Sequence, residues 1–197
     1  MKKISLVVVI VGVFIILIAW LVFPRTQQPE QTIFSYDFEN GLGDWAIGAQ
    51  VPKDPLTGEP VAWKIEPTTD ESVSGNFSIQ LYIDGVQDDG TIWIERKLSL
   101  QANFARRVNV SFQFWSGSDS FNTIAEVVCY VGEKSPKEEA DFQVLGTANQ
   151  VSGWKTYSFS SLAKTGNKGE IYIALGISVR WEAEMTYFVD DVTLNLI

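Results

Sequence analysis

Aromatic, acidic and basic side chains recur at alternate positions in three segments of this 197-residue chain. Flat aromatic rings pack against the apolar faces of sugar rings, and carboxylate and guanidinium groups hydrogen-bond the hydroxyl groups around the rim. This combination of residue types predicts a binding face for a glycan. The candidate ligand-binding residues are Trp93, Glu126, Tyr130, Tyr172 and Arg180.

Two other interpretations of these aromatic rows remain open. Tyr and Trp have a high strand propensity, so they can lie on an outer face without a ligand, and the polar segment 133–150 could cover them. Exposed aromatic patches also form contacts between proteins. The residue types therefore leave a glycan ligand and a protein partner as alternatives.

The residue types argue against most enzymatic chemistry. The chain contains no histidine, which excludes His-dependent catalytic triads and His-ligated zinc sites. The single cysteine, Cys129, has no histidine to activate it, and the sequence contains no glycine-rich phosphate-binding motif. A glycosidase needs only two carboxylates, and Glu95 and Glu126 both lie in the outer rows. We therefore expect a non-catalytic protein, with a hydrolase as the weakest alternative.

Asp190 raises a separate question near the end of the chain. In the segment YFVDDVTLNLI it has the same parity as Phe188, Val192 and Leu194, which alternate like the core-facing row of a strand. A carboxylate that points into a core is costly unless an ion neutralises it or hydrogen-bond donors surround it. The parity therefore predicts a partner for Asp190.

Nearly all periodic segments alternate with period two, which predicts an all-β fold. Turns rich in Gly, Asn and Asp separate them, for example at 74–76 and 88–90. Nine short strands at this spacing predict an antiparallel two-sheet sandwich of the jelly-roll type. Residues 133–150 do not alternate and are expected to form a long loop, or a loop with a short strand. Residues 101–107 are expected to allow a helical turn. The expected strands are 32–39, 61–67, 77–84, 91–100, 108–115, 124–131, 154–161, 170–179 and 186–196. Alternation predicts four inner rows that face the core, namely Phe77, Ile79, Leu81 and Ile83; Ile92, Ile94, Leu98 and Leu100; Val108, Val110, Phe112 and Phe114; and Ile171, Ile173, Leu175, Ile177 and Val179.

An uncharged apolar run occupies residues 4–23, which is long enough as a helix to cross a bilayer. Lys2 and Lys3 precede it and favour a cytoplasmic N-terminus. A cleaved signal peptide is the alternative. We therefore expect a transmembrane signal anchor at 1–23, a linker at 24–31 and a β-sandwich domain at 32–197. The domain is expected on the extracytoplasmic side of a single-pass cell-membrane protein.

The region after the apolar run is strongly acidic. Residues 31–197 contain 12 Lys and Arg and 23 Asp and Glu, a net charge of −11. Such a surface as a whole repels nucleic acid and anionic lipid and suits divalent cations and neutral ligands. Cys129 is expected to be a small buried hydrophobic residue. Because it is the single cysteine of the chain, no intrachain disulfide can form, and the stability of the domain must come from its core or from a metal.

Four segments together resemble the jelly-roll carbohydrate-binding modules of the cellulose- and xylan-binding type, within the galactose-binding-like superfamily. They are FSYDFENGLGDW (34–45), SGNFSIQL (74–81), WKTYSFS (154–160) and YFVDDVTL (187–194). The resemblance covers essentially all of 31–197. It implies a jelly-roll domain that binds a polysaccharide or glycan, although the long 133–150 segment departs from the pattern of the sugar binders.

Modules of this kind commonly hold a structural Ca2+ ion between their first and last strands. The resemblance implies Glu39 and Asp190 as carboxylate ligands, with main-chain carbonyl groups from Ser72 to Gly75 completing the shell. Calcium takes oxygen ligands of these types. The alternative is that Asp190 accepts hydrogen bonds from the backbone of a loop.

The sequence therefore favours a membrane-anchored, extracytoplasmic, non-catalytic carbohydrate-binding module. A different class of function is also open, namely a structural or adhesive jelly-roll domain whose aromatic sheet binds a protein partner. An orphan glycoside hydrolase is the least favoured of the three.

Overall fold

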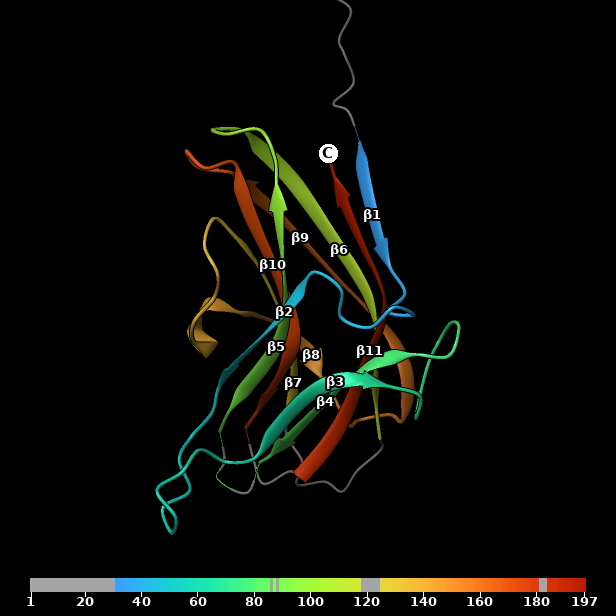
Figure 1. Ribbon diagram of the computed structural model, residues 1–197, viewed down its shortest axis with the longest axis vertical. Helices are drawn as coiled ribbons and strands as arrows, with labels where there is room; N and C mark the ends of the chain where they lie inside the picture. The colour runs from blue at the N-terminus through green and yellow to red at the C-terminus, as the bar shows by residue number, and fades with distance from the viewer. Residues whose placement is uncertain (1–30, 86, 88, 118–124, 181–183) are drawn as a thin grey trace, which may run out of the picture. The chain divides into compact units, whose positions relative to one another are not determined.

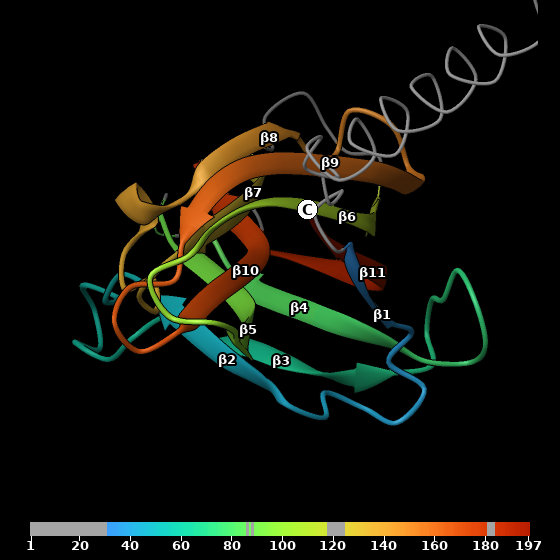
Figure 2. The ribbon, with the colours of Figure 1, turned by 90° about the horizontal axis from the view of Figure 1, so that it is seen from above.

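The computed structural model describes residues 31–85, 87, 89–117, 125–180 and 184–197, and residues 31–197 form one compact unit (Figures 1 and 2). The predicted membrane anchor and most of the linker lie outside the described residues. Among the residues that are described, no helix has the length and apolar character needed to cross a membrane.

The described residues form eleven strands in two antiparallel sheets, as the all-β prediction required. The elements are β1 (Thr32–Tyr36), β2 (Trp45–Gln50), β3 (Trp63–Thr68), β4 (Ser78–Asp84), β5 (Thr91–Ser99), β6 (Ala105–Ser116), β7 (Ala125–Gly132), η1 (Glu139–Asp141), β8 (Gln143–Thr147), β9 (Gly153–Lys164), β10 (Glu170–Val179) and β11 (Glu184–Leu196). Sheet A has the order β3-β4-β11-β6-β9, with β1 also paired to β11, and sheet B has the order β2-β5-β10-β7-β8. Figure 2 shows the strands of the two sheets from above.

Each of the nine predicted strands has a counterpart, and two further strands complete sheet B. The segment 133–150 contains the short strand β8, and the edge strand β2 was not predicted. In β2 Trp45 is buried but Ile47 is exposed, so the strand does not alternate like a core strand. The helical turn expected at 101–107 is wrong. Asn103 has a left-handed φ of 56°, which ends a right-handed turn, and the chain enters β6 two residues later.

The core lies between the sheets and is made of the predicted inner rows of both. Their side chains have at most a few per cent of their surface exposed, which supplies the main driving force for folding. Two predicted members are exceptions, because Phe77 precedes β4 and is exposed, and Leu100 follows β5 and is only partly buried. The inner rows include Ile79, Leu81, Ile83, Ile92, Ile94, Val108, Val110, Phe112, Phe114, Ile171, Ile173, Leu175 and Ile177.

A β-bulge in β11 corrects the parity that the sequence suggested for this strand. The register against β6 shifts between Asp190 and Thr193, and Asp191 has a φ of 47°. The extra residue reverses which side chains face the core. Tyr187 and Val189 therefore belong to the core before the bulge, whereas Val192, Leu194 and Leu196 belong to it afterwards.

Phe188 consequently lies outside the core between the sheets, where alternation had placed it, and is instead buried on the outer side of sheet A. It pairs with Trp115 on the neighbouring strand, and the two rings meet edge to face with centroids 5.2 Å apart. Asp190 pairs with Gln113 and lies on the same outer side of sheet A. Asp190 is nevertheless fully buried, so a structure outside the core must cover it.

The strand β11 also changes its partner at this point. Before the bulge it pairs with β4, and after the bulge it pairs with β1, while β6 lies along its other edge. The bulge therefore lies where neither β4 nor β1 pairs with the strand. The loop between β3 and β4 reaches this position and provides two of the hydrogen-bond donors to Asp190, while Glu39 in the chain after β1 binds the same loop.

Candidate ligand-binding face

All five predicted ligand-binding residues come from sheet B, and they lie on its outer face. Trp93 belongs to β5, Glu126 and Tyr130 to β7, and Tyr172 to β10, while Arg180 follows β10 directly. The register aligns Trp93 with Gly176 of β10, and Tyr130 with Ala174 of the same strand. The prediction that these residues share one face is therefore consistent with the pairing of the strands.

Much of this face is covered by the segment between β7 and β8, residues 133–142, which we call the strap. Phe142 of the strap packs on Trp93 and on Tyr130, with ring centroids 5.1 and 6.0 Å apart. The hydroxyl group of Tyr130 donates a hydrogen bond to the carbonyl of Lys134 at 2.8 Å, and Ser135 donates one to Glu95 at 2.7 Å. The strap thus occupies the area in which a sugar ring was expected.

Trp93 is the residue most affected, since only 4% of its surface is exposed. Its indole ring lies over Gly48 of β2, where a Cβ would come within 2.3 Å of the ring. On the other side Gly176 of β10 allows equally close approach of the strands. The glycines let the indole lie flat on the sheet and the strap seals it, so Trp93 presents no ring face to solvent.

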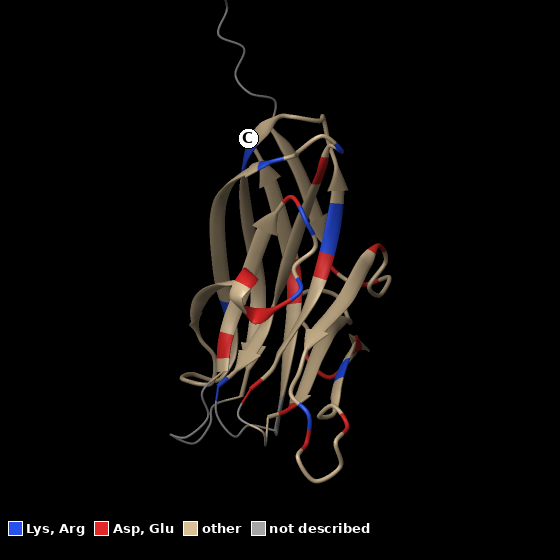
Figure 3. Cartoon of the chain, turned by 90° about the vertical axis from the view of Figure 1, so that its left-hand side faces the viewer, with Lys and Arg blue, Asp and Glu red and all other residues tan. Residues whose placement is uncertain are grey.

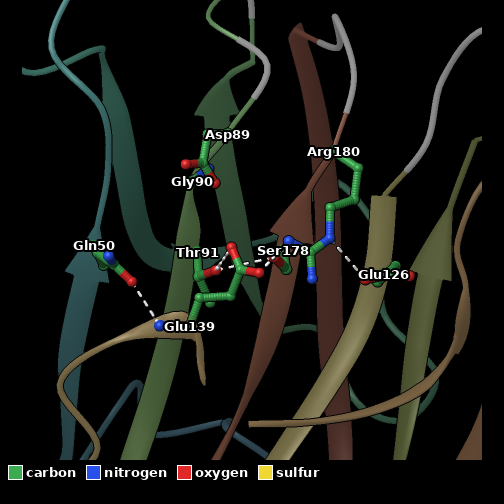
Figure 4. Close-up of polar contacts among 8 residues, drawn as sticks. All are labelled: Gln50, Asp89, Gly90, Thr91, Glu126, Glu139, Ser178 and Arg180. Atoms are coloured by element: carbon green, nitrogen blue, oxygen red, sulfur yellow. Dashed lines mark hydrogen bonds and ion pairs between the residues drawn. The ribbon is translucent and has the colours of Figure 1, made fainter. Parts of the chain in front are cut away.

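A polar cluster holds the strap at the other end of the face (Figure 4). Glu139 of η1 forms an ion pair with Arg180, which also pairs with Glu126 at 2.9 Å. The second carboxylate oxygen of Glu139 accepts a longer bond of 3.4 Å from the buried Thr91, and its backbone N–H is bonded to the side chain of Gln50. Glu126 and Arg180 are therefore engaged in fixing the strap.

The strap also affects the pKa of Glu95. Burial beneath the strap raises the pKa of Glu95, although its hydrogen bond from Ser135 works in the opposite direction. A raised carboxylic acid pKa is also a property of a general acid. Here the second carboxylate, Glu126, is neutralised by Arg180, so the pair does not resemble the acid and base of a glycosidase.

An open groove lies where the strap meets the turn between β9 and β10. It has a volume of about 290 Å3, and Tyr172 forms part of its wall. The ring of Tyr172 is half-buried, and partial burial and the neighbouring Glu170 raise the pKa of its hydroxyl group. The groove therefore combines one aromatic ring with polar side chains of both charges. Its other lining residues are Glu133, Lys134, Ser135, Thr165, Gly166, Asn167, Lys168 and Glu170.

The residues predicted to bind calcium lie together on the other sheet, at the bulge of β11. The carboxylate of Asp190 accepts hydrogen bonds from the backbone N–H groups of Val73 (2.9 Å), Ser74 (3.3 Å) and Asp191 (2.7 Å). Burial raises the pKa of Asp190, and these three bonds lower it by less. The loop between β3 and β4 is therefore the cover that buries Asp190.

Glu39 holds the following part of the same loop. One of its carboxylate oxygens accepts hydrogen bonds from the N–H groups of Asn76 and Phe77, both at 2.8 Å. Gly75 has a φ of 62°, and a Cβ there would lie 2.3 Å from the carboxylate carbon of Glu39. The two acids thus fasten one loop at neighbouring points.

These contacts test whether the partner of Asp190 is a calcium ion or the backbone of a loop. N–H groups face both carboxylates, and both oxygens of Asp190 are already acceptors, so the side chains as placed do not form a calcium shell. In the described part of the chain, no group of three or more acidic or cysteine side chains is placed to hold a metal. Ser72 contributes a hydroxyl bond to the carbonyl of Gly75 at 3.4 Å. Calcium stays a prediction.

The comparisons with known proteins concern the fold. No protein-family model matches the chain, and no curated protein matches its sequence. Among solved structures, the tandem CBM22-1-CBM22-2 domain of Paenibacillus barcinonensis Xyn10C matches with a TM-score of 0.54 at 16% identity, over 87% of this chain and 52% of that one. The CBM22-2 xylan-binding domain of the same protein matches with a TM-score of 0.50 at 16% identity, over 82% and 97% of the two chains.

A protein of another class shares the fold to the same degree. The K1 cleaved adhesin domain of Lys-gingipain from Porphyromonas gingivalis matches with a TM-score of 0.51 at 14% identity, over 83% of this chain and 97% of that one. At such identities these similarities show the fold alone. The chain has the jelly-roll β-sandwich fold of carbohydrate-binding modules, as its sequence motifs predicted, and the fold does not select the ligand.

Proposed function

We propose that residues 31–197 form a non-catalytic glycan-binding domain whose ligand contacts the groove at Tyr172. The groove itself carries this proposal, because it lies at a part of the predicted binding face that the strap leaves open. Tyr172 was among the predicted contact residues, whereas the groove residues from the strap and from the turn at 165–168 were not. They come from loops, whose spatial position alternation does not indicate.

The chemistry of the groove suits a neutral, hydroxyl-rich ligand. The Tyr172 ring offers an apolar face for one sugar ring, and its hydroxyl group lies 3.4 Å from a carboxylate oxygen of Glu170. Lys168 and Asn167 contribute donors, and Glu133 contributes acceptors, around the same space. Because the groove is lined by both acidic and basic side chains, it suits a neutral ligand with many hydrogen-bonding groups better than a single ion. The net charge of −11 likewise disfavours polyanions such as nucleic acid.

The location of the domain is part of the same proposal. The apolar segment 4–23 would anchor the chain in the cell membrane and place the sandwich outside the cytoplasm, where polysaccharides are found. A calcium ion at Glu39 and Asp190 would add stability to this domain without taking part in glycan binding. Both statements are predictions from the sequence.

One observation favours a second function, the binding of a protein partner. The ring that was expected to receive a sugar, Trp93, is already covered by Phe142, so the aromatic part of the face serves the fold. A domain of this kind would be structural or adhesive. The adhesin domain that shares the fold shows that the sandwich accommodates such a role, without indicating that this chain has it.

Binding assays with a soluble 31–197 protein separate the two functions. A glycan array and calorimetry with xylo-oligosaccharides should detect binding, and Tyr172→Ala should weaken it by roughly 5- to 150-fold, the effect of losing an aromatic anchor worth about 1–3 kcal/mol. Tyr172→Phe keeps the ring and should retain most of the affinity. Lys168→Ala should weaken binding, whereas Lys137→Ala, on the strap but outside the groove, should not.

Two results would overturn the glycan proposal. One is a folded protein that binds no glycan on the array. The other is glycan binding that Tyr172→Ala leaves unchanged while thermal melting shows the variant to be folded. Binding to proteins alone would favour the second function.

A further inference from the structure

One corner of the sandwich exposes an unusual combination of apolar and basic side chains, which we call the terminal patch. It lies where β1 begins and β11 ends, beside the C-terminus marked in Figure 1. Four large apolar residues there are 57%, 41%, 64% and 40% exposed, namely Ile33, Phe104, Leu162 and Ile197. Arg106 and Arg107 complete the patch.

The pairing of the strands makes this patch continuous. Arg107 is paired with Leu162 across β6 and β9, and its backbone exchanges two hydrogen bonds with Ile197. Ile33 lies one row further along, paired with Asn195. The guanidinium group of Arg106 stacks over the ring of Phe104 at 4.7 Å. The six side chains therefore cover adjoining positions on the rim and outer face of sheet A.

The charge of this corner is opposite to that of the domain. The segments that meet there, 31–36, 98–109, 159–169 and 192–197, contain four Lys and Arg and no Asp or Glu side chain, so they are positive even when the α-carboxylate of Ile197 is counted, although residues 31–197 carry a net charge of −11. Figure 3 shows Lys and Arg near the marked C-terminus, with most Asp and Glu further away. The repulsion of anionic surfaces expected from the net charge therefore does not apply to this corner, since exposed charges act over about one Debye length, ~8 Å at physiological salt.

Basic groups next to exposed apolar side chains match the interface of an anionic bilayer. The apolar side chains insert below the headgroups, while arginines remain at the level of the phosphates with their stems in the apolar layer. Arginine also forms paired hydrogen bonds to phosphate. The contact would be weak for a free domain, because a few charges and shallow insertions give only marginal binding.

The chain supplies the reason why this surface would be a membrane. β1 starts at Thr32, and the predicted linker of residues 24–31 spans at most about 28 Å when fully extended. If residues 4–23 cross the bilayer, the start of β1 stays within that distance of the surface. The tether then raises the effective concentration of the patch at the membrane, so even a weak contact is populated.

We propose that the terminal patch docks the domain on anionic lipid headgroups of the membrane in which the chain is anchored. This inference depends on the proposed membrane anchor and not on glycan binding. Glycan arrays therefore test the proposed function separately from the experiment below.

A fluorescent probe on the full chain in proteoliposomes tests the docking. Leu162→Cys, labelled with a fluorophore sensitive to its environment, reports on the patch, and Leu56→Cys, 93% exposed on the turn at 54–58, is the matched control. The native Cys129 should remain unlabelled, because it is buried and burial raises its pKa to about 12. Soluble iodide then measures the access of solvent to each probe.

In vesicles that contain phosphatidylglycerol, the probe at Leu162 should be protected from iodide, whereas the probe at Leu56 should not. In pure phosphatidylcholine the protection should be largely lost. Each arginine is expected to change the docking equilibrium by about fivefold, so R106E/R107E should abolish the protection. K53E/K137E, which makes the same change in charge at two exposed lysines outside the patch, should preserve it.

Two results would overturn the proposal. Equal quenching of both probes in anionic vesicles would show that the patch does not reach the membrane. Protection at Leu162 that is independent of lipid charge and of R106E/R107E would show that a protein surface, such as a second copy of this chain, covers the patch.

Discussion

Replacement of Asp190 by alanine should loosen the loop between β3 and β4 and destabilise the domain. The carboxylate is fully buried and accepts three hydrogen bonds from backbone N–H groups, two of which belong to Val73 and Ser74 of that loop. Alanine leaves these donors without an acceptor, and water must reach them or the loop must move. The variant therefore tests whether Asp190 fastens the loop.

The magnitude follows from the number and kind of these bonds. A hydrogen bond to a charged group is worth about 1.5–3 kcal/mol. The two loop donors lie near the surface and regain water when the loop opens, and removal of Asp190 also relieves the cost of burying a charge. We therefore expect the free energy of unfolding to fall by about 3 kcal/mol, which is less than the sum of the three hydrogen-bond contributions. For a domain of this size that corresponds to a fall in Tm of roughly 6–12 °C.

Thermal melting of the soluble 31–197 protein measures this loss. Asp70→Ala, an exposed acid in the same loop, is the matched control and should change Tm little. Glu39→Ala should destabilise the domain as well. The Glu39→Ala/Asp190→Ala double variant should lower the free energy of unfolding by less than the sum of the two single effects, because both acids hold one loop. A Tm for Asp190→Ala within 2 °C of the unchanged protein would refute the account of the loop, taking about 2–4 °C per kcal/mol.

The dependence on pH has a definite sign. Burial raises the pKa of Asp190 in the fold, so the folded state binds the proton more tightly than the unfolded chain. From the unfolded value near 4 up to the raised value, this residue's contribution to stability therefore increases as the pH falls. Asp190→Asn lacks the titrating group and should not show this increase. A bound calcium ion would lower the pKa instead and reverse the trend.

A chelator separates the ion from the hydrogen bonds directly. If calcium binds at Glu39 and Asp190, excess chelator should lower the Tm of the unchanged protein, and either alanine variant should remove the difference. At a free calcium concentration one hundred times the Kd, the linkage is about 2.7 kcal/mol. Identical melting curves with and without chelator would end the calcium prediction and leave the hydrogen-bonded loop.

Two further predictions concern the covered face and the core. Trp93→Ala should lower the free energy of unfolding by about 3–5 kcal/mol, measured by chemical denaturation, because it removes a buried indole between Gly48 and Phe142. A loss below about 1 kcal/mol would show that the strap does not seal the ring. Cys129 should react with a thiol reagent only after unfolding, since its pKa is raised to about 12 by burial, and rapid modification of the native protein at neutral pH would contradict its position in the core.

The sequence by itself determined the class of fold and the face of most strands. Alternation with period two is a local property of the covalent chain, so it identified the inner rows of β4, β5, β6 and β10 without knowledge of their neighbours. It also gave Trp93, Tyr130 and Tyr172 their outward positions within their own strands, and the strand order of the jelly roll brings them to one face of sheet B. The short motifs predicted the jelly roll, and in the structure they lie in β1 and the turn into β2, at the start of β4, in β9 and in β11.

The tertiary structure decided what lies on top of those faces. Alternation gave Asp190 the parity of a core residue, but the bulge beside it reverses the parity, and this bulge lies where β11 changes its partner from β4 to β1. Likewise the outward position of Trp93 was predictable, whereas its burial depends on the docking of Phe142 from a segment about fifty residues further along the chain. Contacts between segments so far apart are set by the packing of the whole sandwich, and no local pattern records them.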